Sequence, residues 1–264
     1  MKTSYALTLL SAALLLAACG GEGDKTQAHG PDPKLAAQQS SLLPSMKIAE
    51  PAPWGEQKPK VPQGYSITAI ATDLAIPRQT LVLPNGDILI AEGRGGSAAK
   101  LKPKDVIASL IKAEGNTKVK GGNRLTLLRD ADGDGTYELK TVFADNLNAP
   151  YGLAFANNKL YVANQDALVS FDYTDGQTKA SGPPSKVTDL PAQINHHWTK
   201  SLAVSADGSQ LYVGIGSNSN VTERGMEVEI DRAMVWQIDA ASGAHKPYAT
   251  GLRNPTALTI QPDT

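Results

Sequence analysis

The sequence is poor in several features that define whole classes of protein. It has a single cysteine, Cys19, so an internal disulfide is excluded, and no apolar run after Ala18 is long enough to span a bilayer. Neither sign of charge predominates: the formal net charge is −1. No basic face and no alternation of Arg with aromatic residues indicates nucleic-acid binding. A CxxCH motif for covalent haem is absent as well.

The N-terminus has the composition of a secretory signal. Lys2 precedes an apolar run from Tyr5 to Ala18, which is too short for a stable membrane span. The stretch "LAAC" resembles a bacterial lipobox, in which Cys19 is lipidated and becomes the new N-terminus. A plain signal peptide with a chance cysteine is the alternative. Gly20 stands where an aspartate would indicate retention at the inner membrane. We therefore expect a lipoprotein signal over 1–18 and an envelope lipoprotein anchored at the outer membrane, facing the periplasm.

The following segment differs sharply from the rest of the chain. Residues 19–62 are polar and rich in Gln, Ser, Lys and Pro, a composition typical of a flexible tether. Residues 63–264 then leave about 200 residues, enough for one sizeable hydrophobic core.

Internal repeats indicate the fold of that core. Four segments share an apolar strand, a turn of Gly, Asn or Asp and, where the chain continues, a second apolar strand. They begin at Ile76, Asn148, His197 and Arg253. Their anchoring leucines are Leu81, Leu153, Leu202 and Leu258. This spacing suits the four-stranded blades of a propeller. The sequence thus predicts an all-β propeller, with a β-sandwich as the structural alternative.

The segments between the repeats complete this prediction. Residues Arg124 to Leu147 and Ala233 to Leu252 have the pattern of the outer hairpins of two blades, and Pro103 to Gly115 is a helical insertion in the first blade. About four blades are visible, and the chain stops just after the first strand of the last. Because a propeller must close on itself to bury its edges, we expect a partial, C-terminally truncated propeller.

Aligning the repeats brings polar residues into register. The loops that enter the innermost strands of a propeller open at one mouth of its central channel, so equivalent positions should converge there. Five residues before the anchor leucines stand Ile76, Asn148, His197 and Arg253, followed by Pro77, Ala149, Trp198 and Asn254. His197 is a candidate general base and Arg253 a donor for negative charge. The alternative is that both simply cap a loop or start a turn. His196 is out of phase and should point elsewhere.

Several stretches match one family in order and spacing across nearly all of Gly64 to Thr264. They are "LNAPYGLAF", "NRLTLLRDADGDG", "HHWTKSLAVSADGSQLYVGIGS" and "GLRNPTAL". Together they resemble the glucose/sorbosone dehydrogenase family, in particular its sorbosone dehydrogenase-like branch. The resemblance implies a six-bladed propeller that uses pyrroloquinoline quinone (PQQ) and calcium to oxidise sugars in the periplasm.

The resemblance also implies roles for residues of the aligned column. His197 stands five residues before its strand leucine, as the family's catalytic base does. Arg253 and Asn254 match the family's "RNP" pair at the quinone or reacting centre, and Asn148 is a further candidate cofactor ligand. In the implied reaction His197 removes a proton from the sugar hydroxyl or hydrated aldehyde, and hydride passes to the quinone. Arg253 and a quinone-bound Ca²⁺ steady the charge, and the electrons leave to a separate acceptor.

The sequence departs from the family at one position beside the base. Ser217, in "GSNS", replaces an aspartate that supports the family's histidine, which puts base strength and sugar preference in question. Further PQQ contacts and the calcium-binding carbonyls would lie beyond Thr264, so this chain alone is expected to be inactive. A non-catalytic envelope propeller that binds a carbohydrate or a protein is the alternative function. A lactonase would need an acidic metal cluster in the channel, which the column lacks.

Weaker signals lie outside the column. Asp130, Asp132 and Asp134 alternate in "DADGDGTYE" and have the hard oxygen ligands of a structural Ca²⁺ site, although Thr141 stands where an EF-hand needs glutamate. Asp-Gly pairs also build hairpin turns without metal, so both interpretations stay open. A second pair, Glu92 and Arg94, is a candidate for lining the mouth of the channel. A third pair, Glu229 and Arg232, has the pattern of a solvated ion pair in a loop.

Overall fold

The computed structural model describes residues 55–96 and 119–261. The signal expected over 1–18, the lipidation site Cys19 and the helical candidate from Pro103 to Gly115 lie outside these residues. Within the described ranges, no helix is long and apolar enough to cross a membrane.

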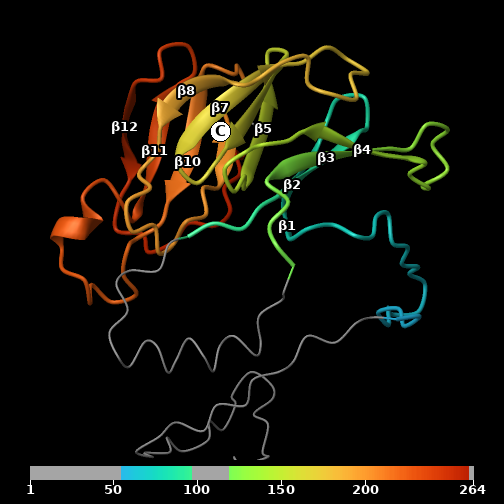
Figure 1. Cartoon of the computed structure of the whole chain (residues 1–264), viewed down its shortest axis with the longest axis horizontal. Helices are drawn as coiled ribbons and strands as arrows, with labels where there is room; N and C mark the ends of the chain where they lie inside the picture. The colour runs from blue at the N-terminus through green and yellow to red at the C-terminus, as the bar shows by residue number, and fades with distance from the viewer. Residues whose placement is uncertain (1–54, 97–118, 262–264) are drawn as a thin grey trace, which may run out of the picture. The chain divides into compact units, whose positions relative to one another are not determined.

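The described residues form three four-stranded antiparallel sheets (Figure 1). In each sheet the strands follow chain order from one edge to the other. The first sheet contains β1 (Pro77–Val82), β2 (Ile88–Glu92), β3 (Arg124–Arg129) and β4 (Leu139–Ala144). The second contains β5 (Gly152–Ala156), β6 (Lys159–Ala163), β7 (Ala167–Asp172) and β8 (Ser185–Asp189). The third contains β9 (Leu202–Val204), β10 (Gln210–Ile215), β11 (Met234–Asp239) and β12 (His245–Ala249).

These sheets are consistent with propeller blades, and we call them blades 1, 2 and 3. The anchor leucines Leu81, Leu153 and Leu202 lie in the first strands of the three blades, and both predicted outer hairpins are confirmed as β3–β4 and β11–β12. The segment from Arg253 onward forms no strand within the described residues, so the fourth repeat contributes a loop here. The one helical turn of the described part, η1 (Glu227–Glu229), connects β10 to β11.

Alternation along the strands explains why the blades stack. In blade 2, Leu160 and Val162 belong to a core shared with blade 1, whereas Tyr161 and Ala163 belong to a core shared with blade 3. Successive side chains of a strand point to opposite faces of its sheet. Blade 2 is therefore apolar on both faces and is packed between its neighbours.

The innermost strands approach one another closely. Strand β5 lies beside both β1 and β9. A side chain at Gly152, the first residue of β5, would collide with the Lys200 carbonyl and would place its Cβ 2.7 Å from the Cβ of Leu202. Glycine at this position lets blades 2 and 3 meet where the chain enters their inner strands.

A partly buried ion pair joins the two central strands of blade 1. Glu92 is fully buried, and its carboxylate accepts hydrogen bonds from Arg124 and from Thr126. Burial alone would raise the pKa of Glu92, but these hydrogen bonds outweigh it and the pKa is lowered. The expectation that Glu92 lines the channel mouth is therefore wrong: its side chain turns into the blade and holds β2 to β3.

Candidate functional site

Two residues of the predicted column meet at the loop that follows β10. The backbone N–H of His197 donates to the Ser217 carbonyl at 3.2 Å, and the N–H of Ser217 donates to the Arg253 carbonyl at 2.9 Å. Ser217 thus lies between two segments that are far apart in sequence. The convergence of His197 and Arg253, predicted from the repeats, is observed.

A glycine makes this close approach possible. A Cβ at Gly216 would lie 2.5 Å from the Cβ of His197 and 2.6 Å from Oδ1 of Asn254. Real Cβ atoms do not come so near to other heavy atoms, so a side chain here would push the two segments apart. Gly216 therefore lets both His197 and Asn254 pack against one backbone position.

Ser217 determines which nitrogen of His197 carries the proton. Nδ1 of His197 lies 2.9 Å from the Ser217 carbonyl oxygen and 2.9 Å from its Oγ. The Ser217 hydroxyl donates its own proton to the Ser219 carbonyl at 2.6 Å, so both atoms facing Nδ1 are acceptors. Nδ1 must then be the donor, and in the neutral ring the lone pair is on Nε2. Nε2 has no hydrogen-bond partner among the described residues.

The surroundings of His197 favour its neutral form. Burial lowers the pKa of its imidazole. The hydrogen bond to Ser217 opposes this effect, whereas the charges of His196 and Arg253 add to it. Ser217 is neutral and brings no carboxylate charge to the ring, so the imidazole is available as a base near neutral pH. His196 is not independent of the site, because its ring packs edge-on against His197 with centroids 4.7 Å apart.

Arg253 and Asn254 are placed differently from each other. Arg253 is exposed, and its guanidinium donates from Nε to the Asn220 carbonyl at 3.1 Å and from Nη2 to the Asn220 side chain. Asn254 is half-buried, and its Oδ1 accepts from the Thr199 hydroxyl at 3.4 Å. This leaves the Asn254 amide N–H₂ without a partner among the described residues.

Asn148 belongs to a neighbouring network rather than to the pair at Ser217. Its Nδ2 donates to Asp166 at 2.7 Å and its Oδ1 accepts from Gln165 at 2.8 Å. Gln165 in turn accepts from the N–H of Gly96 at 3.0 Å. Asn148 therefore joins the loops of blades 1 and 2, and its side chain bonds to neither His197 nor Arg253.

Two buried cations support the backbone behind the site. Lys200 is fully buried and donates to Oδ1 of Asn195 at 3.1 Å and to the Trp198 carbonyl at 3.0 Å. Arg232 is also buried and donates to the Gly216 carbonyl at 3.1 Å. The guanidinium of Arg232 forms no ion pair with Glu229, whose carboxylate accepts from the Asn218 N–H. The expectation of a solvated Glu229–Arg232 pair is therefore wrong, because Arg232 turns inward to hold backbone carbonyls.

Innermost strand β1 contributes a cation beside the aromatic neighbour of His197. The guanidinium carbon of Arg78 lies 5.0 Å from the ring centroid of Trp198, and its Nε donates to the Gly93 carbonyl at 2.8 Å. Tyr151 packs edge-on against Trp198 with centroids 5.8 Å apart. A cavity of about 370 Å³ opens here between inner strand β1 and the loop of the fourth repeat. Its lining consists of Pro77, Arg78, Gln79, Tyr151, Thr256, Ala257 and Leu258.

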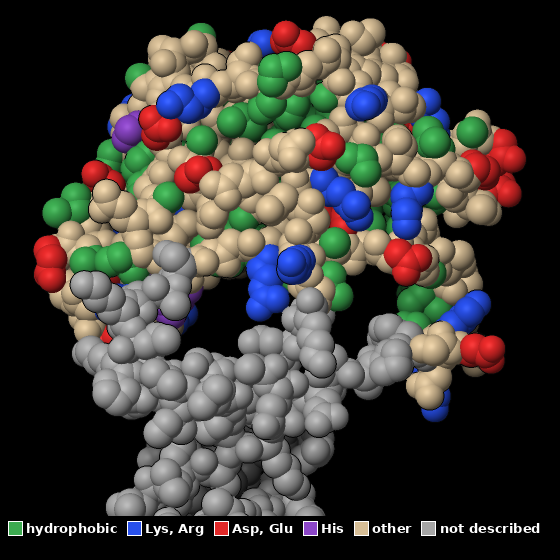
Figure 2. All heavy atoms as spheres, viewed as in Figure 1, with side chains coloured by type: hydrophobic (Ala, Val, Ile, Leu, Met, Phe, Trp, Pro, Cys, Tyr) green, Lys and Arg blue, Asp and Glu red, His purple; other side chains and the backbone are tan. Residues whose placement is uncertain are grey.

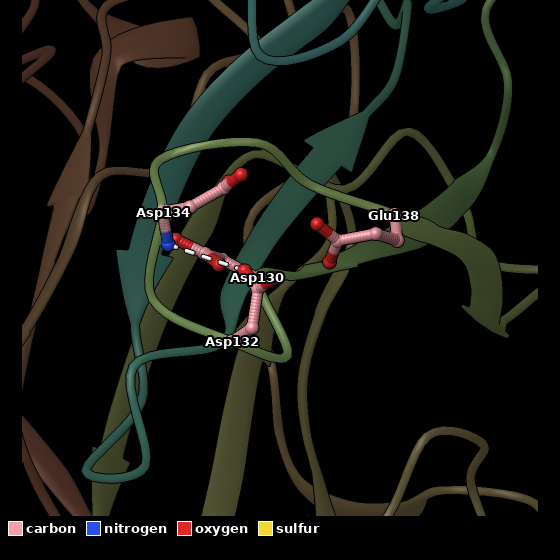
Figure 3. Close-up of side chains that lie close together, drawn as sticks. All are labelled: Asp130, Asp132, Asp134 and Glu138. Atoms are coloured by element: carbon pink, nitrogen blue, oxygen red, sulfur yellow. Dashed lines mark hydrogen bonds between the residues drawn. The ribbon is translucent and has the colours of Figure 1, made fainter.

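The acidic loop between β3 and β4 lies apart from the residues around Ser217. Figure 2 shows red side chains gathered on the loop at the right of the molecule, beyond β3 and β4 of Figure 1. Ligand atoms of Asp130, Asp132, Asp134 and Glu138 all lie within 4.8 Å of one another, and Glu138 points across the loop (Figure 3). Backbone N–H groups of the same loop donate to all four carboxylates. The cluster therefore suits a cation, but it also stabilises its own turn.

Sequence comparison gives the chain a family. A family described as a domain of unknown function, DUF7133, matches residues 60–260. The chain belongs to this family. No curated protein matches the sequence.

Solved structures similar to this member of the DUF7133 family support the fold. The PQQ domain of pyranose dehydrogenase from Coprinopsis cinerea, in its holo form, is 17% identical with a TM-score of 0.54, and the match covers 74% of this chain and 43% of that domain. A calcium structure of a Trichoderma reesei carbohydrate-active enzyme of family AA12 is 18% identical with a TM-score of 0.50, covering 79% of this chain and 47% of the other. The chain thus spans less than half the length of either structure. At these identities the likeness concerns the fold alone.

Sequence reasoning missed the cations of this DUF7133 chain. Arg78 stands two positions after the aligned column, where the repeats show no shared polar pattern. In an extended segment every second side chain points to the same face, so Lys200 should lie on the same face as Trp198 and Leu202. A lysine on the same face as a core leucine is a signal that its side chain is buried. The importance of Asn195 depends on the tertiary fold and has no local signal.

Proposed function

We propose that this DUF7133 protein oxidises a hydroxyl or a hydrated aldehyde of a sugar in the cell envelope, as a PQQ-dependent sugar dehydrogenase of the sorbosone or aldose type. The observation that carries the proposal is the geometry of His197. Ser217 accepts from Nδ1 through two oxygens, which leaves the lone pair of Nε2 free to take a proton.

The chain's own residues perform the proton transfer and the orientation of the substrate. His197 Nε2 accepts the proton of the substrate hydroxyl, because its Nδ1 is held as a donor by Ser217. The guanidinium of Arg253 stands beside the loop that holds the base and stabilises negative charge that develops on the substrate oxygen. The amide of Asn254, held by Thr199, offers a neutral donor next to it.

The donors near Ser217 suit the quinone that the proposal requires. PQQ, when bound, supplies the two-electron acceptor, and its carboxylates and carbonyls need cationic and amide donors. Arg253 and Asn254 are such donors and would hold it, whereas Asn148 is already engaged by Asp166 and Gln165. Among the described residues, metal-ligating side chains gather only in the acidic loop.

The fold comparison and the sequence supply the rest of the proposal. The similar domain from Coprinopsis cinerea carries PQQ in its name, which is a property of that protein. For this chain, six blades in the complete propeller, a separate electron acceptor and attachment to the outer membrane through Cys19 are inferred from the resemblance and the lipobox.

Reconstitution tests the proposal. The full-length protein, supplied with PQQ and Ca²⁺, should reduce an artificial electron acceptor when aldoses or sorbosone are added. His197→Ala should lower kcat by about 10²–10⁴-fold, the contribution of a positioned general base. Because burial lowers the pKa of His197, the acidic limb of the kcat/KM profile should lie below the usual histidine value of about 6.5. His245→Ala is the matched control, since His245 is exposed on the outer strand β12.

Two outcomes would contradict the proposal. If the reconstituted protein neither bound PQQ nor oxidised any of the sugars, the dehydrogenase proposal would be wrong and the non-catalytic binding propeller would be favoured. If His197→Ala turned over as fast as the His245→Ala control, a dehydrogenase could remain but the base would be misassigned.

A further inference from the structure

The cavity beside β1 contains a cation whose role the proposed reaction does not explain. Arg78 is half-buried on the innermost strand of blade 1 and lines this cavity. Its Nε is fixed by the Gly93 carbonyl at 2.8 Å. Its two terminal nitrogens have no hydrogen bond or ion pair with the other described residues. The guanidinium is thus oriented by one contact while its remaining donors stay available.

Aromatic packing keeps this guanidinium in place. Its carbon lies 5.0 Å from the Trp198 centroid, a distance at which a cation is attracted to the ring face. Trp198 is itself confined, because Cβ atoms at Gly95 and Gly96 would lie 2.8 Å and 3.0 Å from its ring. Tyr151 closes another side and donates its hydroxyl proton to the Thr256 carbonyl at 3.2 Å. The cation therefore stands on a rigid aromatic support.

Within the part of the chain that the structure describes, no carboxylate balances the charge of Arg78. Burial lowers the pKa of its guanidinium, the Tyr151 phenol raises it, and the nearby charge of Arg94 lowers it again. No Asp or Glu of the described residues shifts this pKa. A partly desolvated guanidinium with free donors gains most from an anion that forms two parallel hydrogen bonds.

The cavity is small and adjoins the candidate base. At about 370 Å³ it is at the lower end of the range of ligand pockets, which suits a monosaccharide rather than a polymer. Trp198 follows His197 directly in the chain, so a ligand gripped at Arg78 lies next to the segment that carries the base.

We propose that Arg78 is a subsite for the carboxylate of an acidic sugar, so that the protein prefers a uronic or related sugar acid to a neutral aldose. This inference deepens the proposed function and rests on it for the chemistry at His197. A sugar acid and PQQ both carry carboxylates that Arg78 could bind. The test therefore has to distinguish a sugar carboxylate at Arg78 from a quinone carboxylate.

Calorimetric binding with glucuronate and glucose tests the subsite without needing turnover. Wild-type full-length protein should bind glucuronate about 10–100-fold more tightly than glucose, as expected for one charge-assisted, bidentate contact. Arg78→Gln should remove this preference and leave glucose binding unchanged. Arg78→Lys should retain part of it, because lysine keeps the charge but not the planar fork. Lys246→Gln, on the exposed outer strand β12, is the matched control and should behave as wild type.

The binding results show whether Arg78 holds the carboxylate of a sugar acid or that of the quinone. Equal affinity of the wild type for both sugars, or an equal loss of both in Arg78→Gln, would overturn the subsite. If Arg78→Gln weakened PQQ binding, followed by its absorbance, and left the glucuronate preference intact, Arg78 would serve the quinone and the sugar-acid inference would be wrong. Arg78-dependent glucuronate binding in a protein that oxidises nothing would retain the subsite and reject the dehydrogenase.

Discussion

Lys200 shows how much a single buried charge influences the structure behind the site. Its side chain is fully buried, and its ammonium group donates to Asn195 and to the Trp198 carbonyl. Burial and, to a smaller extent, the charge of Arg232 lower its pKa to about 7, against the opposing charge of Asp166. The residue therefore changes from charged to neutral within the physiological range.

This burial makes the stability of the fold depend on pH. Between about pH 7 and 10 the unfolded chain keeps the Lys200 proton and the folded chain releases it, so the free energy of unfolding should rise with pH, by at most about 1.4 kcal/mol per pH unit. Below pH 7 both states are protonated and this contribution stays constant. Urea unfolding at pH 6, 7, 8 and 9 should show the rise in wild type and in Lys246→Met, but not in Lys200→Met. Parallel curves for all three proteins would contradict the assignment.

At the same scale, the sequence predicted the residues that a repeat can align and missed those that only packing defines. His197 and Arg253 were found because equivalent positions of a propeller converge, and the structure joins them at Ser217. Asn148 occupies the same column, yet its amide turns to Asp166 within blade 2. The alignment of repeats predicts where the backbone of each aligned residue lies. The direction of its side chain depends on the hydrogen-bond partners that the fold places beside it.

At the scale of elements, period-two patterns were reliable where both strands of a hairpin are present. The predicted outer hairpins of blades 1 and 3 formed because each apolar strand had a partner across a short turn. The segment from Arg253 has the same apolar pattern, but no partner for Leu258 lies in the described residues, and it remains a loop. A strand is a property of a pair, so its own sequence does not suffice.

The acidic turn between β3 and β4 is an element whose two interpretations differ in one measurable property. Bringing four carboxylates within 4.8 Å is costly without a cation. A calcium site would stabilise the fold by about 2.7 kcal/mol at a concentration 100-fold above Kd, or several degrees in Tm.

We expect Ca²⁺, but not Mg²⁺, to raise the Tm relative to EDTA, since only the larger ion accepts an irregular set of oxygens. Asp132→Asn should abolish the shift while keeping the turn, because an amide oxygen still accepts from the Asp134 N–H, as Asp132 does. Equal Tm values in calcium and in EDTA would leave the carboxylates a purely structural role in the turn.

At the scale of the described molecule, blade 2 transmits stability because it belongs to two cores. Leu160 and Val162 share one core with blade 1, and Leu168 shares the other with blade 3. A blade with two apolar faces cannot remain folded when either neighbour is lost, since the exposed face would lose its burial. The three blades should therefore unfold as one unit.

Hydrogen exchange can follow this coupling. Leu127→Ala removes a fully buried side chain from the core of blades 1 and 2 and should cost about 2–5 kcal/mol. If the blades unfold together, exchange should accelerate not only in β3 but also in β10 of blade 3, which Leu127 does not share a core with. Val82→Ala, at a position 64% exposed on β1, is the control and should leave the exchange rates of β3 and β10 unchanged. Faster exchange confined to blade 1 would show that each blade has its own stability, and that the loop carrying Ser217 is protected by blade 3 alone.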